Sequence, residues 1–351
     1  MQQVTLGRSD VRVSPVSLGT MTFGNQTSAE NAHRQMDRAL DAGITFLDTA
    51  EMYPVNPVRR ETIGRTEEIV GDWIAARGVR DRVQIATKIS GPGDMVRREG
   101  YSGRILRQTL DQSLARLKTD VIDLYQLHWP LRDSYAFRQN WNFDPSRQDK
   151  ARTLDHMADV LEAVADAHKA GKIRAFGLSN ESAWGTARWI DVAERIGAPR
   201  VVAIQNEYSA LYRQFDTDLA ELAVNENVTL LAYSTLAGGL LTGKYLRGAE
   251  PAGSRAAVDR ANGGQGNIGG RRTRRAEEAV AAWHKLMADL RLDPVHAAIA
   301  FTRQRPFPVI PIIGATDTPQ LDHILAGLSL RLTDEALSRI SQFHREYPWP
   351  F

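Results

Sequence analysis

Short apolar runs alternate with amphipathic segments along almost the whole chain. Eight of these runs are rich in β-branched or other large apolar residues, and they fall at Val16 to Gly19, Ile44 to Asp48, Val83 to Lys88, Val121 to Leu127, Ile173 to Ser179, Val201 to Gln205, Val228 to Tyr233 and Val309 to Ile313. A segment with helical periodicity follows each run, which indicates parallel βαβ units. Because eight units follow one another without a linker, the pattern predicts one α/β domain over residues 1–351, a closed (β/α)8 TIM barrel.

Further segments add to this barrel pattern. A β-hairpin is expected before the first strand (Val4 to Leu6 with Val11 to Val13), and extra helices near the C-terminus at Pro294 to Arg303 and Asp334 to Arg345. Three loops that follow strands are longer than simple βα connections, which is typical of functional or mobile segments. They are Gly91 to Gly103, Trp129 to Arg152 and Ser234 to Arg275. In a barrel, such loops rise from the face that carries the active site.

Composition narrows the classes of function. Hydrophobic residues make up 42% and charged residues 25% of the chain, as in an ordinary globular protein. The net charge of +2, with both signs interspersed, favours neither nucleic acid nor a membrane surface, so a small-molecule partner is expected. Cysteine is absent, which excludes disulfides, thiolate catalysis and cysteine-ligated metals. No targeting pattern or membrane-spanning run is present, so we expect a cytoplasmic protein, and we predict no metal site.

One glycine motif is misleading. Gly264, Gly266 and Gly269 spell GxGxxG, the pattern that binds dinucleotides in Rossmann domains. That pattern requires an apolar strand directly before it and a helix that opens within it. The preceding residues, Arg255 to Gly263, are polar and resemble a loop. The motif is therefore interpreted as a flexible loop.

Four residues stand at or just past the ends of the second, third and fourth expected strands: Asp48, Tyr53, Lys88 and His128. Each has an ordinary explanation when taken alone, as a turn residue, a rim tyrosine, a solvated lysine or a histidine bound to backbone. In a barrel, however, these strand ends meet at one mouth. Together the four side chains form a set that can transfer a proton.

Reduction of a carbonyl group requires a proton on its oxygen while a hydride reaches its carbon. A tyrosine hydroxyl with an ordinary pKa of about 10 can supply that proton once the pKa is lowered. An ammonium about 4 Å from the phenol favours phenolate by up to about 4 kcal/mol at an effective dielectric near 20. We therefore predict that Lys88 lowers the pKa of Tyr53, the general acid. Asp48 would hold Lys88, and His128 would orient the carbonyl oxygen.

The order and spacing of these four residues resemble the catalytic tetrad of the aldo-keto reductase superfamily. The resemblance covers nearly the whole chain and includes the segments GTMTFG (19–24), AEMYPV (50–55), LHWP (127–130), GKIR (171–174) and LTGKY (241–245). It implies a barrel that binds extended NADPH across its mouth. The implied function is that of an NADP(H)-dependent oxidoreductase that reduces aldehydes or ketones to alcohols.

The resemblance also implies which residues contact the cofactor. Ser179, Asn180 and Gln205 would hold the nicotinamide carboxamide, and Tyr233 would stack on the ring. The stretch from Ser234 to Lys244 would wrap the pyrophosphate. The individual contacts expected in this stretch and at the adenosine phosphate end are Ser234, Leu236, Gly238, Leu240, Lys244, Gly314, Thr316 and Gln320.

This chain departs from its relatives near the adenosine. Relatives often place Glu and Asn where it has His323 and Ile324, and residues 314–321 lack the basic residue that many use for the 2′-phosphate. Charge-assisted donors for that phosphate must then come from elsewhere. The candidates are Lys244, Arg247 and an arginine cluster that would otherwise be a solvated helix start, namely Arg271, Arg272, Arg274 and Arg275.

The substrate pocket is expected beside Tyr53. Phe23, Met52 and Trp129 would line it, which suits carbonyl compounds with aromatic or hydrophobic substituents. Further walls could come from aromatic residues of the second long loop and of the chain end, namely Tyr135, Phe137, Trp141, Phe143 and Tyr347 to Phe351. No feature of the sequence specifies one particular substrate or an oligomeric state.

Two other functions are compatible with parts of this pattern. A cofactor-binding regulator, like the potassium-channel β subunits, would bind nucleotide with negligible turnover. A barrel aldolase or isomerase would use Lys88 as a Schiff-base nucleophile. The latter requires a deprotonated lysine, whereas the expected partner Asp48 favours the charged form.

Overall fold

The chain folds around a closed barrel of eight parallel strands, in a computed structural model that describes all 351 residues. Strand order around the barrel follows chain order, and the last strand closes on the first. The strands are β3 (Ser17–Gly19), β4 (Phe46–Asp48), β5 (Gln84–Ile89), β6 (Ile122–Leu127), β7 (Ile173–Ser179), β8 (Val201–Glu207), β9 (Thr229–Tyr233) and β10 (Val309–Ile313). The predicted TIM barrel is confirmed.

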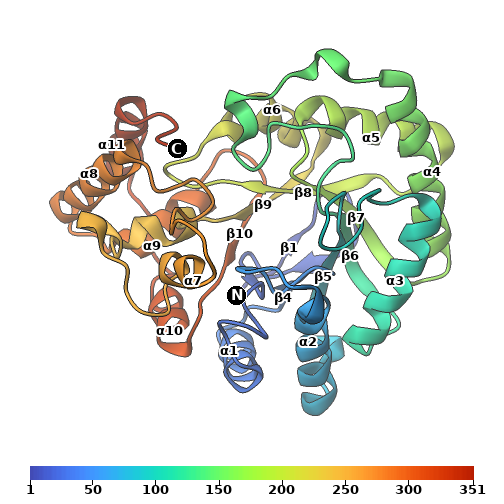
Figure 1. Cartoon of the computed structure of the whole chain (residues 1–351), viewed down its shortest axis with the longest axis horizontal. Coiled ribbons are helices and arrows are strands. Elements are labelled where there is room, and N and C mark those ends of the chain that lie inside the picture. The colour runs from blue at the N-terminus through green and yellow to red at the C-terminus, as the bar shows by residue number, and fades with distance from the viewer.

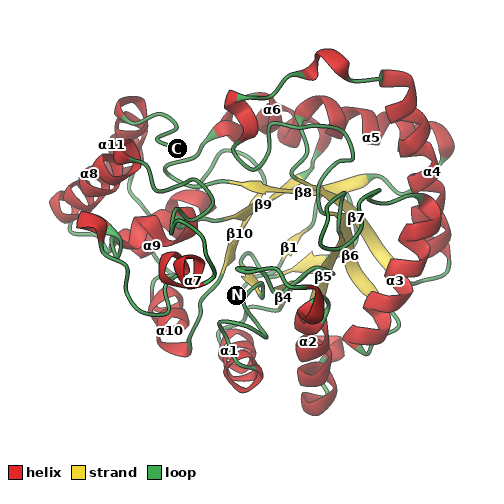
Figure 2. Cartoon of the chain, viewed as in Figure 1, coloured by secondary structure: helices red, strands yellow, loops and turns green.

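Helices surround these strands, as Figure 2 shows. They are α1 (Ala29–Asp41), α2 (Arg65–Arg77), α3 (Gly103–Leu117), α4 (Lys150–Lys169), α5 (Ala183–Ile196), α6 (Asp218–Glu226), α7 (Arg255–Ala261), α8 (Arg274–Leu290), α9 (Pro294–Arg303), α10 (Thr318–Ala326) and α11 (Asp334–Glu346). Several begin at a residue whose side chain accepts a hydrogen bond from a backbone N–H of the first turn, for example Ser102, Asp149 and Ser182. None of the helices has both the length and the apolarity needed to cross a membrane.

The predicted N-terminal hairpin closes one end of the barrel. It consists of β1 (Val4–Thr5) and β2 (Arg12–Val13), which pair antiparallel. Leu6, Val11 and Val13 are buried against inward-facing residues of the strands, including Phe46 and Leu231. Because this end is filled by packed side chains, the open mouth lies at the carboxyl ends of the strands.

Two segments differ from the sequence-based expectation. Residues 255–261 form the short helix α7, capped by the Ser254 side chain, where a loop was expected. The other segment, Pro294–Arg303, is a helix as expected, but α9 packs against β10 as one of the barrel helices rather than as an addition. The additional helices are α11, which was expected, together with α7 and α8, and Figure 1 shows α8 beside α11 at one edge of the molecule.

Candidate active site

The charged centre of the mouth is an ion pair between neighbouring strands. Asp48 ends β4, and Lys88 lies near the end of β5, which pairs in parallel with β4. The Lys88 ammonium donates to Asp48 Oδ2 at 2.8 Å and to the Thr49 carbonyl oxygen at 2.7 Å. Lys88 has no exposed surface, and Asp48 is only 3% exposed. The pair is therefore buried and satisfied within the protein.

Tyr53 and His128 lie beside this pair. Tyr53 is in the loop after β4, and His128 directly follows β6. Lys88 Nζ is 5.0 Å from the centroid of the Tyr53 ring, and the ring centroids of Tyr53 and His128 are 5.7 Å apart in an edge-to-face arrangement. The fold thus brings together all four residues that the sequence singled out.

Two polar atoms of this group remain open. The Tyr53 hydroxyl makes no hydrogen bond to the protein, but it keeps some accessible surface. The Tyr125 hydroxyl, by contrast, is fully buried and has no hydrogen-bond partner. In His128 only Nδ1 is sealed and without a partner. The Tyr53 hydroxyl and His128 Nε2 therefore keep both accessible surface and unused hydrogen-bonding capacity.

The electrostatics of Tyr53 differ from the prediction. Burial and the nearby Asp48 carboxylate raise the pKa of Tyr53 above its ordinary value, although Arg255 acts in the opposite direction. Burial is the larger cause, and it outweighs any lowering by the Lys88 ammonium, which lies 5.0 Å from the centroid of the Tyr53 ring. Burial and the Lys88 ammonium lower the pKa of His128 well below its usual range. At neutral pH the site therefore holds a protonated tyrosine and a neutral histidine.

Residues expected at the nicotinamide form a hydrogen-bonded chain that reaches the ion pair. The Gln205 amide nitrogen donates to Asp48 Oδ1 at 2.7 Å, and the Asn180 amide nitrogen donates to the His128 carbonyl oxygen at 2.9 Å. Ser179 donates to the Gln205 carbonyl oxygen, and the Tyr233 hydroxyl donates to Asn180 Oδ1 at 2.7 Å. These side chains from β7, β8 and β9 are thereby fixed relative to the four central residues.

A glycine turn follows β9 and approaches two cationic side chains. Gly238 and Gly239 both have positive φ, 68° and 97°. A Cβ atom on Gly239 would lie 3.4 Å from Lys244 Nζ, and one on Gly238 would lie 3.9 Å from an Arg255 guanidinium nitrogen. Leu236 and Leu240 flank the glycines, and Ser234, also at positive φ, precedes them. The turn and the two cations therefore border the same small region.

Neither of these cations has an acidic partner. Lys244 and Arg255 form no ion pair, and the only polar contact of the Arg255 guanidinium is with the Met21 sulfur at 3.6 Å. Burial lowers the pKa of each group, Arg255 lowers that of Lys244 further, and Arg271 lowers that of Arg255 further. Sequence reasoning missed Arg255 because the surrounding polar residues resemble a loop. Two unpaired, partly buried cations beside glycine backbone form a site for an anion.

The arginine cluster does not provide such a site. Arg271 is buried and pairs with Glu207 at 2.8 Å, and Arg272 pairs with Glu250. Arg274 begins α8 with a 95% exposed side chain. Two members of the cluster are thus held in structural ion pairs, while Arg274 and Arg275 are exposed at the start of α8.

The adenosine end of the expected cleft is an exposed corner at the start of α10. The Gln320 amide nitrogen donates to Thr316 Oγ1 at 2.9 Å, and Gly314 precedes this corner with an exposed backbone. His323 lies one turn further along α10 and Ile324 is buried. Gly314, Thr316 and Gln320 therefore lie together at this corner, and their contact with the adenosine end stays a prediction.

Aromatic residues border the catalytic group. Trp129 lies 4.9 Å from His128 and 6.0 Å from Phe137 between ring centroids, and its indole N–H donates to the Pro92 carbonyl oxygen. Gly91 makes room for this indole, since a Cβ atom there would lie 2.3 Å from it. Met52 is partly exposed, whereas Phe23 is fully buried in the core. A small hollow beside them is lined by Asn180 and Tyr233 together with Tyr135 and Phe137 of the second long loop.

The C-terminal residues meet this loop. Trp349 packs edge-to-face on Trp141 at 6.5 Å between ring centroids, and the buried Phe351 stacks on Tyr212 at 5.9 Å. Thr273 donates to the Pro350 carbonyl oxygen. The tail therefore contacts the second long loop through Trp349 and Trp141, and their place in a substrate pocket stays a prediction.

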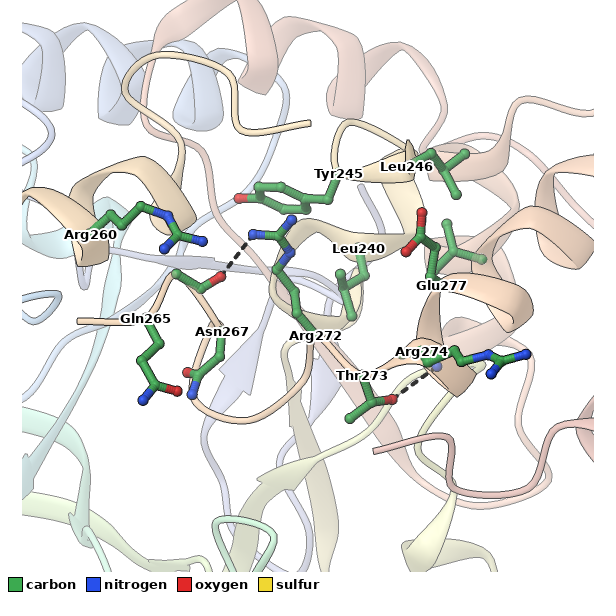
Figure 3. A pocket seen from close by; sticks show the side chains of 13 residues that line it. Leu240, Tyr245, Leu246, Arg260, Gln265, Asn267, Arg272, Thr273, Arg274 and Glu277 are labelled. Carbon is green, nitrogen blue, oxygen red and sulfur yellow. Dashed lines mark hydrogen bonds between the residues drawn. The ribbon is translucent and has the colours of Figure 1, made fainter. Parts of the chain in front are cut away.

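A second and more open pocket lies outside this group. It has a volume of about 400 Å³ and is lined by residues of the loop around 265–273, by Tyr245 and by the first turns of α8 (Figure 3). Arg272 crosses its centre and donates to the Gly266 carbonyl oxygen at 3.0 Å. The GxGxxG glycines belong to this loop and follow no strand, which confirms that they are not a Rossmann motif. No residue of the catalytic group lines the pocket.

Comparison with known proteins identifies the class of barrel. A family model described as the aldo/keto reductase family matches residues 15–345. The chain belongs to the aldo/keto reductase family. It is therefore an oxidoreductase of a family that generally uses NAD(P)H and acts on small carbonyl compounds.

Individual relatives match over most of their length. Protein tas of Escherichia coli (strain K12) is 42% identical over 359 aligned positions, which cover 100% of this chain and 99% of the relative. The uncharacterized oxidoreductase YrpG of Bacillus subtilis is 31% identical, with 100% and 97% covered. Norsolorinic acid reductase stcV of Emericella nidulans is 28% identical, with 94% and 78% covered.

Proposed function

We propose that this protein is an NADPH-dependent reductase of aldehydes or ketones in which Tyr53 protonates the carbonyl oxygen. The observation that carries the proposal is the position of the accessible Tyr53 hydroxyl beside Lys88 and His128. Lys88 itself is held in an ion pair with Asp48. Burial keeps Tyr53 protonated, which is the state that a general acid requires before the reaction. As the proton leaves, the Lys88 ammonium stabilises the phenolate that forms.

His128 has a tautomer suited to orienting the substrate. A neutral imidazole carries one N–H, and burying that donor without a partner would cost about 1–3 kcal/mol. Because Nδ1 is sealed and unpartnered, the N–H belongs on the accessible Nε2. His128 then donates a hydrogen bond to the same carbonyl oxygen that Tyr53 protonates, and it remains neutral because its pKa is low.

The cofactor would lie along the mouth from the catalytic group to α10. Ser179, Asn180 and Gln205 would bind the carboxamide, and Tyr233 would contact the nicotinamide ring. Lys244 and Arg255 fit the diphosphate or the 2′-phosphate, because both are unpaired cations beside the glycine turn. Gly314, Thr316 and Gln320 would contact the adenosine end. When bound, the reduced nicotinamide supplies the hydride for the carbonyl carbon.

The position of Lys88 argues against Schiff-base chemistry. A Schiff-base lysine must be deprotonated and must reach a carbonyl carbon. Lys88 has no exposed surface, and its ammonium is bound by Asp48 and by the Thr49 carbonyl oxygen. A substrate could reach it only by displacing these partners, whereas the Tyr53 hydroxyl is open.

The test is an NADPH titration by fluorescence, followed by the decay of nicotinamide absorbance with a panel of aromatic aldehydes. We expect binding with turnover in the wild type. Tyr53→Phe should lower kcat by roughly 100-fold or more while the affinity for NADPH changes little, because general acid–base catalysis contributes about 10²- to 10⁴-fold. Binding with no turnover of any aldehyde would favour the regulator, and absence of binding would refute the cofactor cleft.

A further inference from the structure

A histidine pair and a carboxylate meet on the outer wall of the barrel. Asp293 caps the N-terminus of α9, His296 lies in the first turn of α9, and His323 lies on α10. Figure 1 shows these two helices on the same side of the barrel. One ring nitrogen of each histidine and one Asp293 oxygen lie within 4.8 Å of one another. We propose that these three residues bind a divalent transition metal of the zinc type.

The distances fit such an ion. Two ligands of a tetrahedral zinc with bonds of 2.0–2.1 Å lie about 3.3–3.4 Å apart. His323 Nε2 is 3.3 Å from Asp293 Oδ2, and His296 Nδ1 is 3.9 Å from Asp293 Oδ1. The Asp293–His323 pair therefore already has the separation of two zinc ligands, and the other two pairs, which lie within 4.8 Å, must close by up to roughly 1.5 Å. Two imidazoles and one carboxylate suit zinc, cobalt or nickel better than the oxygen-seeking Mg²⁺ or Ca²⁺.

Hydrogen bonds around the three residues orient the ligand atoms. His296 Nε2 lies 2.7 Å from the His323 carbonyl oxygen, to which it donates, so that Nδ1 carries the free lone pair. Asp293 Oδ1 accepts from the backbone N–H groups of Val295 and His296, which leaves Oδ2 for an ion. A metal-binding histidine usually donates its second ring N–H to a carbonyl or carboxylate in this way.

Packing holds the inner histidine in position. A Cβ atom on Gly327 would lie 2.1 Å from Cγ of His296, so the imidazole lies directly against the glycine backbone. The His323 ring stacks on it at 4.7 Å between centroids. The His296 side chain is 20% exposed and that of His323 is 50% exposed. The site is thus ordered on its inner side and open to solvent on its outer side, which leaves a coordination position for water.

The ordinary alternative is an exposed ion pair between His323 and Asp293. That arrangement gives His296 Nδ1 no hydrogen-bond partner and predicts no affinity for metal ions. The metal site uses none of the catalytic residues, and its test does not depend on the proposed reductase activity, although His323 lies on α10 beside the expected adenosine end. Both alternatives can therefore be tested without cofactor or substrate.

The experiment uses tag-free full-length protein stripped with a chelator. Zn²⁺ is titrated by calorimetry, and Co²⁺ is added to detect the visible absorption of a protein-bound ion. We expect one site per chain. His323→Ala and Asp293→Asn should each raise the Zn²⁺ dissociation constant at least tenfold, since loss of even an outer hydrogen-bond partner typically costs about 10- to 100-fold. Asparagine caps helices as well as aspartate, so Asp293→Asn keeps the start of α9 intact.

The matched control is His168→Ala, which removes an exposed histidine at the end of α4. It should bind Zn²⁺ like the wild type. Zinc should also raise the midpoint of thermal unfolding in the wild type and in His168→Ala, but not in His323→Ala. Absence of Zn²⁺ binding would overturn the proposal. Equal affinity in the wild type and in both cluster variants would also overturn it, because the ion would then lie elsewhere.

Discussion

Two cationic regions lie at the barrel mouth, and they differ in how their charge is compensated. Lys88 is surrounded by protein acceptors, with Asp48 at 2.8 Å and the Thr49 carbonyl oxygen at 2.7 Å. Lys244 and Arg255 approach a glycine turn and have no carboxylate partner. The first arrangement is complete without a ligand, whereas the second leaves positive charge uncompensated. We therefore expect the Lys88 region to orient the catalytic residues and the region of Lys244 and Arg255 to bind an anion.

The largest expected effect concerns the completed pair. Lys88→Met should lower the free energy of unfolding by about 3–5 kcal/mol, because it leaves the Asp48 carboxylate buried without its partner. Urea unfolding of the cofactor-free protein measures this change. The double variant Asp48→Asn with Lys88→Met should recover part of the loss, since no unpaired charge remains. If Lys88→Met alone were as stable as the wild type, Lys88 would not be needed to compensate the buried Asp48 carboxylate, and the proposed difference between the two regions would be wrong.

The second effect concerns affinity for the cofactor. Lys244→Met and Arg255→Met should each raise the dissociation constant for NADPH by roughly 10- to 100-fold, which corresponds to about 1.5–3 kcal/mol for a hydrogen bond to a charged group. Fluorescence titration provides the measurement, and repetition with NADH shows whether either cation binds the 2′-phosphate. Arg104→Met, which removes an exposed arginine on α3, is the control and should change the affinity little. Unchanged NADPH affinity in both variants would show that Lys244 and Arg255 do not bind a phosphate of the cofactor.

The smallest effect is a gain in stability. Burial lowers the pKa of Lys244, so the charged form is disfavoured in the folded state relative to the unfolded chain. At neutral pH this reduces stability, and the cost is relieved as the pH rises toward the ordinary lysine pKa of about 10.4. Lys244→Met should therefore raise the free energy of unfolding at pH 7 by on the order of 1 kcal/mol, with less gain near pH 10. Urea unfolding at both pH values tests this, and destabilisation at pH 7 would show that Lys244 has a stabilising partner.

Much of the fold could be predicted because it depends on local patterns. The bounds of Ile173–Ser179 and Val309–Ile313 agree with the expected strands, and Pro294–Arg303 agrees with the expected helix. These segments combine strong periodicity with clear end signals, such as the Asp293 cap and Pro294 at the start of α9. The short helix α7 was missed because its seven residues are mostly small or polar and give no apolar stripe.

The candidate site was predicted unevenly for a physical reason. Asp48, Lys88 and His128 could be grouped because their positions at strand ends follow from the barrel topology. The role of Arg255 could not, since it depends on how the long loop after β9 folds back toward Tyr53. Likewise, the different roles of the neighbouring arginines become visible only through tertiary contacts. Arg271 forms an ion pair with Glu207, and Arg272 forms one with Glu250.

The sequence by itself determined the eight-unit barrel, the face that carries the site and the identity of the four central residues. These follow from periodicity and from residue types at strand ends, which are properties of the chain alone. Only the tertiary structure decided which charges are compensated and how far each is buried. It showed that burial and the Asp48 carboxylate raise the pKa of Tyr53, and that Lys244 and Arg255 form no ion pair. Burial and charge pairing depend on segments distant in sequence, so no local pattern contains them.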